Sequence, residues 1–177
     1  QNYLGYDPYD ILLSPLYYKA FGNLLPNIAI QIHKRNPLNI RKALGISKEN
    51  NPKAMGLFLK ANCLLYYKYK DPLYLDEAKK IFFWLSENTS KGYAGKCWGY
   101  NFPWASSTGF LPAYTPSVVV TSSVIDGIFE YFKATSSDQA KDLILSASKY
   151  IKTNIPVTST SEGISFAYTH LSKGCCY

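Results

Sequence analysis

The sequence predicts an all-α fold, in which repeated helical hairpins form part of an α/α toroid that is incomplete in this chain. Apolar residues recur at helical spacing over most of its length, and helices that are apolar on nearly every side alternate with helices that have one polar side. A chain of 177 residues with 47% hydrophobic and 18% charged residues fits one globular domain, residues 1–177. No apolar run reaches the roughly 20 residues of a membrane span, so we expect none.

The N-terminal part of the chain predicts two short helices. Ser14 followed by Pro15 is typical of a helix start, because serine caps the free N–H groups and proline fits the first helical position. The first helix is therefore expected over 15–22. The second is expected over 24–36, where Pro26 is tolerated because it lies in the first turn.

After a connector over 37–52, the sequence predicts four longer helices, over 52–70, 74–88, 116–134 and 137–154. The first and third of these are apolar on nearly every side, as in a helix that neighbours cover on more than one face. The second and fourth have one polar side. We therefore expect buried inner helices and half-exposed outer helices to alternate around a ring.

The two outer helices share a register that indicates an internal repeat. Equivalent positions lie 62 residues apart, since Asp76, Ala78, Ile81 and Leu85 match Asp138, Ala140, Leu143 and Ala147. A short aromatic segment follows each outer helix, over 97–102 and 163–168. In a toroid such connectors lie at one end of the ring, so we expect both segments at one rim.

The chain contains about two and a half such hairpins, so we expect it to be the N-terminal half of a larger toroid. A half ring leaves the apolar side of its last inner helix open. We expect that side to be covered by the missing C-terminal half or by another copy in a homo-oligomer.

The charge and the cysteine content indicate which partners and which cellular compartment to expect. The net charge of +7 comes from lysines that are scattered along the chain, which argues against nucleic acid and suits an acidic carbohydrate. The four cysteines lack the spacing of a metal site or a disulfide framework, and no Gly-rich phosphate loop is present, so we expect no metal and no cofactor. Cys63 reads as a buried apolar residue. A reducing compartment, and hence a cytoplasmic location, is the expectation.

Several stretches carry a resemblance to a known family. "GYDPYDILLSP", "NIRKALGISKENNPKAMGLFL", "CWGYNFPWASSTGFLPAYTPSVVVTSSVIDG" and the terminal "CCY" together resemble the N-terminal half of a poorly characterised family of α/α toroid proteins found among polysaccharide-related genes. The resemblance implies a fold akin to six-hairpin glycosidases, polysaccharide lyases and terpenoid-cyclase-like rings, and it implies no established reaction.

Some members of that family carry the label delta-aminolevulinic acid dehydratase. The label conflicts with the sequence, because that enzyme is a TIM barrel with a Schiff-base lysine and no alternation of strands and helices appears here. We interpret it as an error of transfer.

Three carboxylates are the first candidates for catalysis. Asp126 stands on a helix that is otherwise apolar nearly all round, and a buried acid must be paired, hydrogen-bonded or protonated. Its neighbour Gly127 permits close approach of another backbone. Asp7 and Asp10 form a pair that could serve as acid and base in glycoside cleavage, or could instead cap turns and the following helix.

The remaining candidates are aromatic or histidine residues. Tyr100 and His170 are candidates for proton transfer, whereas His33, at the basic end of its helix, is expected to interact with the last carbonyl groups. Aromatic rings can stack on sugars or can plug the end of the ring. The expected substrate-binding residues are Trp98, Trp104, Phe102 and Thr115.

The leading functional hypothesis is a carbohydrate-active or carbohydrate-binding protein, acting, if it is an enzyme, as a glycosidase or lyase. A noncatalytic scaffold that binds a partner protein is the first alternative. The lyase of the family label is the second, and it predicts formation of porphobilinogen from aminolevulinate.

Overall fold

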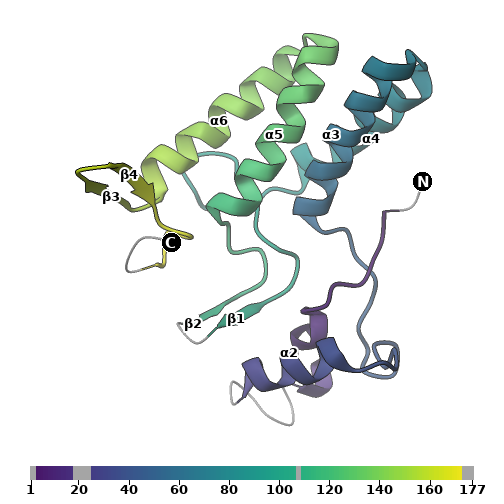
Figure 1. The fold of residues 1–177 in the computed structure, drawn as a ribbon, viewed down its shortest axis with the longest axis vertical. Helices are drawn as coiled ribbons and strands as arrows, with labels where there is room; N and C mark the ends of the chain where they lie inside the picture. The colour runs from purple at the N-terminus through teal and green to yellow at the C-terminus, as the bar shows by residue number, and fades with distance from the viewer. Residues whose placement is uncertain (1–2, 18–24, 107–108, 173–177) are drawn as a thin grey trace. The chain divides into compact units, whose positions relative to one another are not determined.

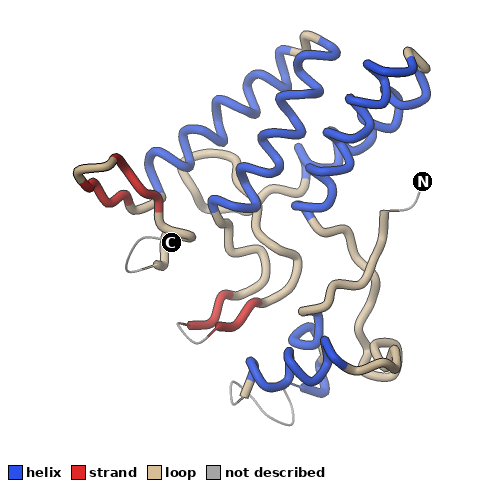
Figure 2. The backbone as a smooth tube through the Cα atoms, viewed as in Figure 1, coloured by secondary structure: helices blue, strands red, loops and turns tan. Residues whose placement is uncertain are grey.

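The computed structural model describes residues 3–17, 25–106 and 109–172, and these are mostly helical (Figures 1 and 2). Among the described residues, the helices that lie wholly within the described ranges are one short 3-10 helix and five α-helices: η1 (Asp10–Leu13), α2 (Pro26–Arg35), α3 (Pro52–Tyr69), α4 (Pro72–Glu87), α5 (Val118–Thr135) and α6 (Asp138–Asn154). Two small antiparallel hairpins accompany them, β1 (Trp104–Ser106) with β2 (Gly109–Leu111) and β3 (Val157–Thr160) with β4 (Gly163–Phe166).

The chain divides into two compact units, each described here by itself. The described residues 52–99 and 115–172 form a unit that we call the helical unit. The described residues from 3–51 and 100–114 form a second unit, called here the N-terminal unit. The chain thus leaves the helical unit after residue 99 and returns to it at residue 115. The expectation of one domain within a larger ring stays a prediction.

Side-chain caps fix where the helices of the helical unit begin. The carboxylate of Asp71 accepts from Leu73 N at 2.9 Å, and the hydroxyls of Ser117 and Ser137 cap α5 and α6 in the same way. Pro72 occupies the first turn of α4, where its missing N–H costs nothing. The structure confirms four helices close to the predicted ranges, and three of them begin at a side-chain cap.

The backbones of helices α3 and α5 are in direct contact where the two helices cross. An added Cβ at Gly127 would lie 2.2 Å from the carbonyl oxygen of Gly56, and one at Gly56 would lie 2.8 Å from Val124 Cα. Only glycine fits at such a crossing. The close backbone approach predicted at Gly127 is confirmed, and α4 and α6 pack as the hairpin partners of α3 and α5 (Figure 1).

The repeat register is matched by the buried positions of the two outer helices. Ala78, Ile81 and Leu85 of α4 are buried, and so are their equivalents Ala140, Leu143 and Ala147 of α6. Two successive helical hairpins, α3–α4 and α5–α6, are therefore present. Closure of such hairpins into a ring stays a prediction.

Helix α3 packs against two neighbouring helices, α4 and α5. It is not covered all round, because Leu57 and Leu64 are each about half exposed while the buried side chains form one stripe along the helix, from Met55 to Cys63. The strands of this unit were not predicted. The segment Val157–Thr160 pairs with Gly163–Phe166 as a hairpin, with Gly163 at a φ of 145°, a conformation that glycine tolerates.

The N-terminal unit has its own small core. Ile11 and Leu12 of η1 pack with Ile30 of α2, with Ile46 of the connector and with Ala105 of β1. The described residues 15–17 are helical, and the rest of the helix predicted over 15–22 lies outside the described residues. The second predicted helix is confirmed as α2, which begins at Pro26 as expected for proline in a first turn.

Within the described ranges 3–17, 25–106 and 109–172, no helix is both long enough and apolar enough to cross a membrane.

Candidate functional site

Asp10 is the centre of a buried ion-pair network in the N-terminal unit. It is only 2% exposed, and its carboxylate accepts from the backbone N–H of Asp7 at 3.1 Å. Arg41 Nε lies 3.1 Å and 2.9 Å from its two oxygens, and His33 Nε2 lies 3.0 Å from Oδ1. A buried carboxylate needs such partners to stay charged. Both oxygens are thus engaged, which leaves Asp10 poorly suited to act as a free acid or base.

His33 is the functional candidate that sequence reasoning missed. It was expected at the carbonyl groups that end its helix, but it is buried and turned toward Asp10 instead. The other ring nitrogen, Nδ1, is buried without a hydrogen-bond partner. The available signal was its spacing, because His33 lies three residues after Ile30 and therefore shares the buried face of α2.

Asp7 shapes the turn that leads into η1. Its carboxylate accepts from Tyr9 N at 3.0 Å and from the amide of Asn51 at 3.2 Å. Burial raises the pKa of this carboxyl, and the nearby charge of Asp10 adds to that effect, while the Tyr9 and Asn51 hydrogen bonds and Arg41 act in the opposite direction. The structure therefore brings Asp7 and Asp10 together, in the turn-capping role that was the alternative to catalysis.

Three aromatic rings stack in the same unit. Phe102 is buried, and the half-buried rings of Tyr9 and Tyr100 lie nearly parallel to it, with centroids 6.5 Å and 5.1 Å away. We call these three rings the ring stack. Phe102 is buried, and Lys34 Nζ lies over the ring of Tyr9, 4.8 Å from its centroid, so contact with a ligand at the ring stack falls to the half-buried ring of Tyr100 and in part to that of Tyr9.

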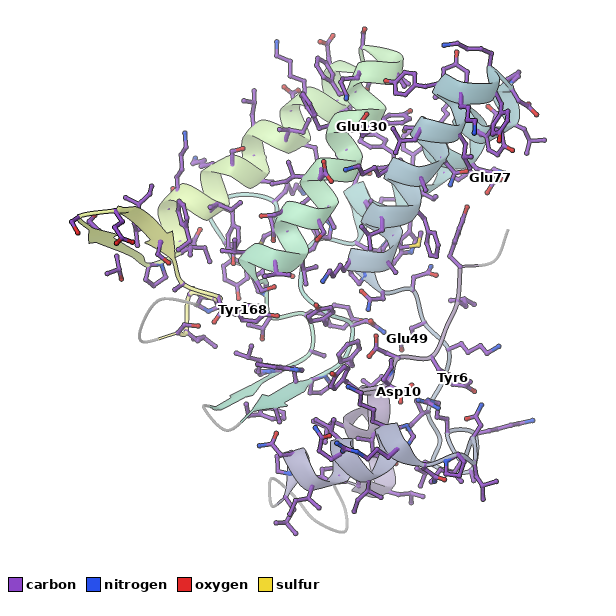
Figure 3. All side chains as sticks on the ribbon, viewed as in Figure 1. Tyr6, Asp10, Glu49, Glu77, Glu130 and Tyr168 are labelled. Carbon is purple, nitrogen blue, oxygen red and sulfur yellow. The ribbon has the colours of Figure 1, made fainter. Side chains whose placement is uncertain are left out.

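Polar and charged groups lie in the same unit as the ring stack. Lys34 Nζ donates to the Tyr9 hydroxyl at 2.9 Å, and the amide of Asn101 donates to Glu49 at 3.1 Å. Tyr6 lies beneath two cations, with Arg41 Cζ 5.2 Å and Lys48 Nζ 5.6 Å from its ring centroid. Figure 3 labels Tyr6, Asp10 and Glu49 of this unit. Carboxylates, an amide and cations thus accompany the rings.

Trp104 begins strand β1, where it pairs with Leu111, and its side chain is half-buried. The predicted residues Asp7, Asp10, Tyr100, Phe102 and Trp104 therefore all belong to the N-terminal unit.

Trp98, by contrast, belongs to the helical unit and is part of its core. Its side chain is fully buried, and its indole N–H donates to the carbonyl oxygen of Leu85 at 3.0 Å. Its backbone N–H donates to the hydroxyl of Thr121 at 3.2 Å. Stacking of Trp98 on a sugar is excluded in this arrangement, because no face of its ring is accessible.

The expectation that Asp126 is buried is wrong. Its side chain is 49% exposed and forms an ion pair with Lys60 at 2.8 Å. The acids buried on the helices are instead Glu77 of α4 and Glu130 of α5, labelled in Figure 3, and each pairs with the lysine three residues later. The lysine lowers the pKa of Glu77.

His170 and Thr115 also lie in the helical unit. The His170 ring meets the edge of Tyr93 with centroids 5.1 Å apart, and its Nδ1 is buried without a hydrogen-bond partner. Burial lowers the pKa of His170 below its ordinary value of 6.5. Thr115 is half-buried shortly before α5. Neither residue contacts a predicted acid among the interactions that the structure gives for them.

Within the part of the chain that the structure describes, nothing supports a reactive cysteine or a metal site. Cys63 and Cys97 are buried thiols whose pKa burial raises to about 12, so neither is a reactive thiolate. Cys175 and Cys176 lie outside the described residues. No group of three His, Cys, Asp or Glu side chains that could hold a metal ion occurs among residues 3–17, 25–106 and 109–172.

Comparison of the chain with known proteins shows no relationship that assigns it a function: no family model matches it, and neither a curated protein nor a solved structure does.

Proposed function

We propose that this chain binds carbohydrate through the N-terminal unit, with the ring stack as the contact surface. The observation that carries the proposal is the parallel arrangement of Tyr9, Phe102 and Tyr100, in which two half-buried tyrosines present ring surface next to polar groups. Flat aromatic faces pack on the apolar faces of sugar rings, and phenol hydroxyls bond sugar hydroxyls.

The cations of the N-terminal unit suit a sugar that carries negative charge. Lys34 bonds the hydroxyl of Tyr9, and Arg41 and Lys48 lie over the ring of Tyr6. The chain as a whole has a formal net charge of +7. Attraction between such cations and an acidic polysaccharide increases the rate of encounter and weakens with salt.

Binding is better supported than catalysis. Asp10 is held by Arg41 and His33, Asp126 is an exposed ion pair, and Trp98 is core. Asp7 is the predicted acid that keeps a pKa raised by burial. If the protein is an enzyme, a glycosidase or lyase step would therefore use Asp7 as its acid.

The repeated hairpins support a larger architecture for this function. We propose that the hairpins α3–α4 and α5–α6 belong to an α/α toroid, as the resemblance to toroid proteins of polysaccharide-related genes implies. The matched buried positions Ala78 and Ala140 support the repeat.

The test is a calorimetric titration with an oligouronate and with a neutral oligosaccharide of the same length. We expect the oligouronate to bind more tightly, and Tyr100→Ala to weaken binding by up to about tenfold, since one aromatic contact contributes about 0.5–1.5 kcal/mol. Tyr69→Ala is the matched control, because Tyr69 is an exposed tyrosine of the helical unit. The proposal fails if neither sugar binds, or if both variants bind as the wild type does.

A noncatalytic scaffold that binds a partner protein is the second candidate. The full burial of Trp98 and the exposed ion pair of Asp126 favour it over an enzyme, because both features are structural. If the calorimetric titration gives no binding heat with either sugar, the scaffold becomes the better supported function.

A further inference from the structure

The turn between α3 and α4 carries a group of aromatic, cationic and apolar side chains, which we call the turn patch. It lies in the helical unit, at one end of the α3–α4 hairpin (Figure 1). The patch and both helices fall within the described range 25–106. Its members come from the last turn of α3, the turn itself and the first turn of α4: Tyr66, Tyr67, Lys68, Tyr69, Lys70, Leu73 and Tyr74.

The two lysines of the turn patch lie over aromatic rings. Lys68 Nζ is 5.2 Å from the ring centroid of Tyr69, and Lys70 Nζ is 5.8 Å from the centroids of Tyr66 and Tyr67. Both lysines are exposed, and neither forms an ion pair among the described residues. Their ammonium groups are therefore open to an anionic partner.

The acids beside the turn patch are already engaged. The carboxylate of Asp71 accepts from Leu73 N at 2.9 Å and so caps α4. The Tyr67 hydroxyl donates to the carbonyl oxygen of Glu130 at 3.4 Å, and the Glu130 carboxylate pairs with Lys133 at 2.8 Å. The stretch 66–74 contains two lysines and one aspartate, so its net charge is positive.

Exposed apolar surface stands beside these cations. Leu73 is 64% exposed and Tyr69 is 56% exposed, and the rings of Tyr69 and Tyr74 lie with centroids 6.1 Å apart. A leucine side chain gains nothing from sugar hydroxyls, and small-molecule sites are concave, unlike the end of a hairpin. The surface therefore fits a broad partner that presents anionic groups and apolar material side by side.

Lys70 occupies a backbone position that suits glycine. Its φ is 56°, in the left-handed region, and its backbone N–H donates to the carbonyl oxygen of Tyr66 at 2.8 Å where α3 ends. Glycine adopts this conformation at lower cost and is the usual residue at such a helix end. Other residues in strained conformations are concentrated at functional sites. The lysine therefore indicates a use for its ammonium group outside folding.

We propose that the turn patch binds the surface of a lipid bilayer that contains anionic lipids. Lys68 and Lys70 contact the headgroup phosphates, while Leu73 and the tyrosine rings enter the boundary between headgroups and acyl chains. Tyrosine is enriched at that depth, and lysine keeps its ammonium group in water while its stem lies on apolar surface. This site does not depend on carbohydrate binding at the ring stack.

The test is cosedimentation of the full chain with vesicles of phosphatidylcholine, alone or with about 30% phosphatidylserine. We expect tighter binding to the anionic vesicles, and weaker binding at higher salt. Lys70→Gly should lower the affinity for anionic vesicles about fivefold, the effect of one cation at such a surface. The variant should be at least as stable as the wild type, because glycine suits that backbone. Lys149→Ala, at an exposed lysine of α6, should bind as the wild type does.

A second variant tests the apolar part of the turn patch. Leu73→Ser should weaken binding to both kinds of vesicle, by about tenfold, because its side chain no longer enters the apolar boundary. Leu145→Ser, at a leucine of α6 that is 59% exposed, is the matched control and should bind as the wild type does.

Four results would overturn the proposal. The first is a wild-type chain that stays in solution with anionic vesicles, and the second is vesicle binding that neither Lys70→Gly nor Leu73→Ser weakens. The third is self-association without lipid that Leu73→Ser abolishes, which would assign the patch to a contact between copies. The fourth is weaker oligouronate binding by Lys70→Gly with unchanged vesicle binding. Tyr100→Ala should bind vesicles normally, so this proposal and the carbohydrate proposal fail separately.

Discussion

The carboxylate of Asp10 connects segments that are far apart in the chain. It reaches His33 across 23 residues and Arg41 across 31 residues, and it is almost completely buried. A buried ion pair adds little net stability to a protein. Removal of one partner is nevertheless strongly destabilising, because it leaves the other charge unpaired in the interior. The ion pair of Asp126 with Lys60 is the exposed counterpart.

Removing the Asp10 carboxylate should therefore destabilise the protein strongly. We expect Asp10→Ala to lower the free energy of unfolding by about 3–5 kcal/mol, because the partly buried guanidinium of Arg41 would lose its anion and the buried Nε2 of His33 would lose its hydrogen-bond partner. Asp126→Ala is the matched control, for which we expect a loss of about 0–1 kcal/mol. Urea denaturation followed by circular dichroism measures both. Similar losses for the two variants would contradict this account of the Asp10 network.

The contacts of His33 and Asp10 show what sequence reasoning leaves out. Local patterns indicated that Asp7 and Asp10 could cap a turn, and the structure has that arrangement. The pairing of Asp10 with His33 depends on how η1 and α2 fold together, which no local pattern encodes. For the same reason Asp126 was taken as buried: α5 is apolar by composition, but the side of α5 that carries Asp126 is left uncovered.

Helices α3 and α5 depend on a contact between two glycines. Gly56 and Gly127 let the backbones meet, and the space beside Gly127 ends at a carbonyl oxygen rather than at a movable side chain. A methyl group there forces the helices apart along their length, with loss of packing on both sides of the crossing.

Gly127→Ala should therefore destabilise the helical unit although alanine favours helix. We expect a net loss of about 1–3 kcal/mol from overpacking, which exceeds the gain of about 1 kcal/mol in helix propensity. Ser122→Ala, at an exposed position of the same helix, should change stability by less than about 0.5 kcal/mol. Thermal unfolding of the two variants gives the comparison. A Gly127→Ala protein as stable as the Ser122→Ala protein would mean that the crossing is loose.

The long helices were predictable because their signals are local. Pro52, Pro72 and the caps Asp71, Ser117 and Ser137 mark their starts, and apolar spacing marks their buried sides. The hairpins were not predicted, although three of the four residues from Val157 to Thr160 are β-branched and Gly163 follows shortly after. The aromatic segment after residue 97 was expected to form one rim, whereas its residues are divided between the two units.

The free energy of unfolding of the whole chain should fall in mild acid because His170 becomes protonated. Burial lowers the pKa of this histidine in the folded state below 6.5, so the unfolded state binds the proton more readily. The contribution of neutral His170 is complete above pH 6.5 and is lost as the pH falls through 6.5 toward the lower folded-state value.

The variant His170→Phe keeps a ring against Tyr93 and removes the titration. We expect the free energy of unfolding of the wild type to fall relative to that of the variant between about pH 8 and about pH 5. Denaturation midpoints at several pH values measure the difference. A difference that is constant with pH would mean that His170 is equally protonated in both states.

Residues 100–114 lie between two segments of the helical unit in the sequence but belong to the N-terminal unit, so the boundary between the units is crossed more than once along the chain. Ala105 packs with Ile11 and Ile30, which precede it by more than seventy residues. A cut after residue 51 therefore separates the first part of the N-terminal unit from residues 100–114, which belong to the same unit, whereas it leaves the described residues of the helical unit on one fragment. A ribosome must have made the middle of the sequence before the first fifty residues can finish folding.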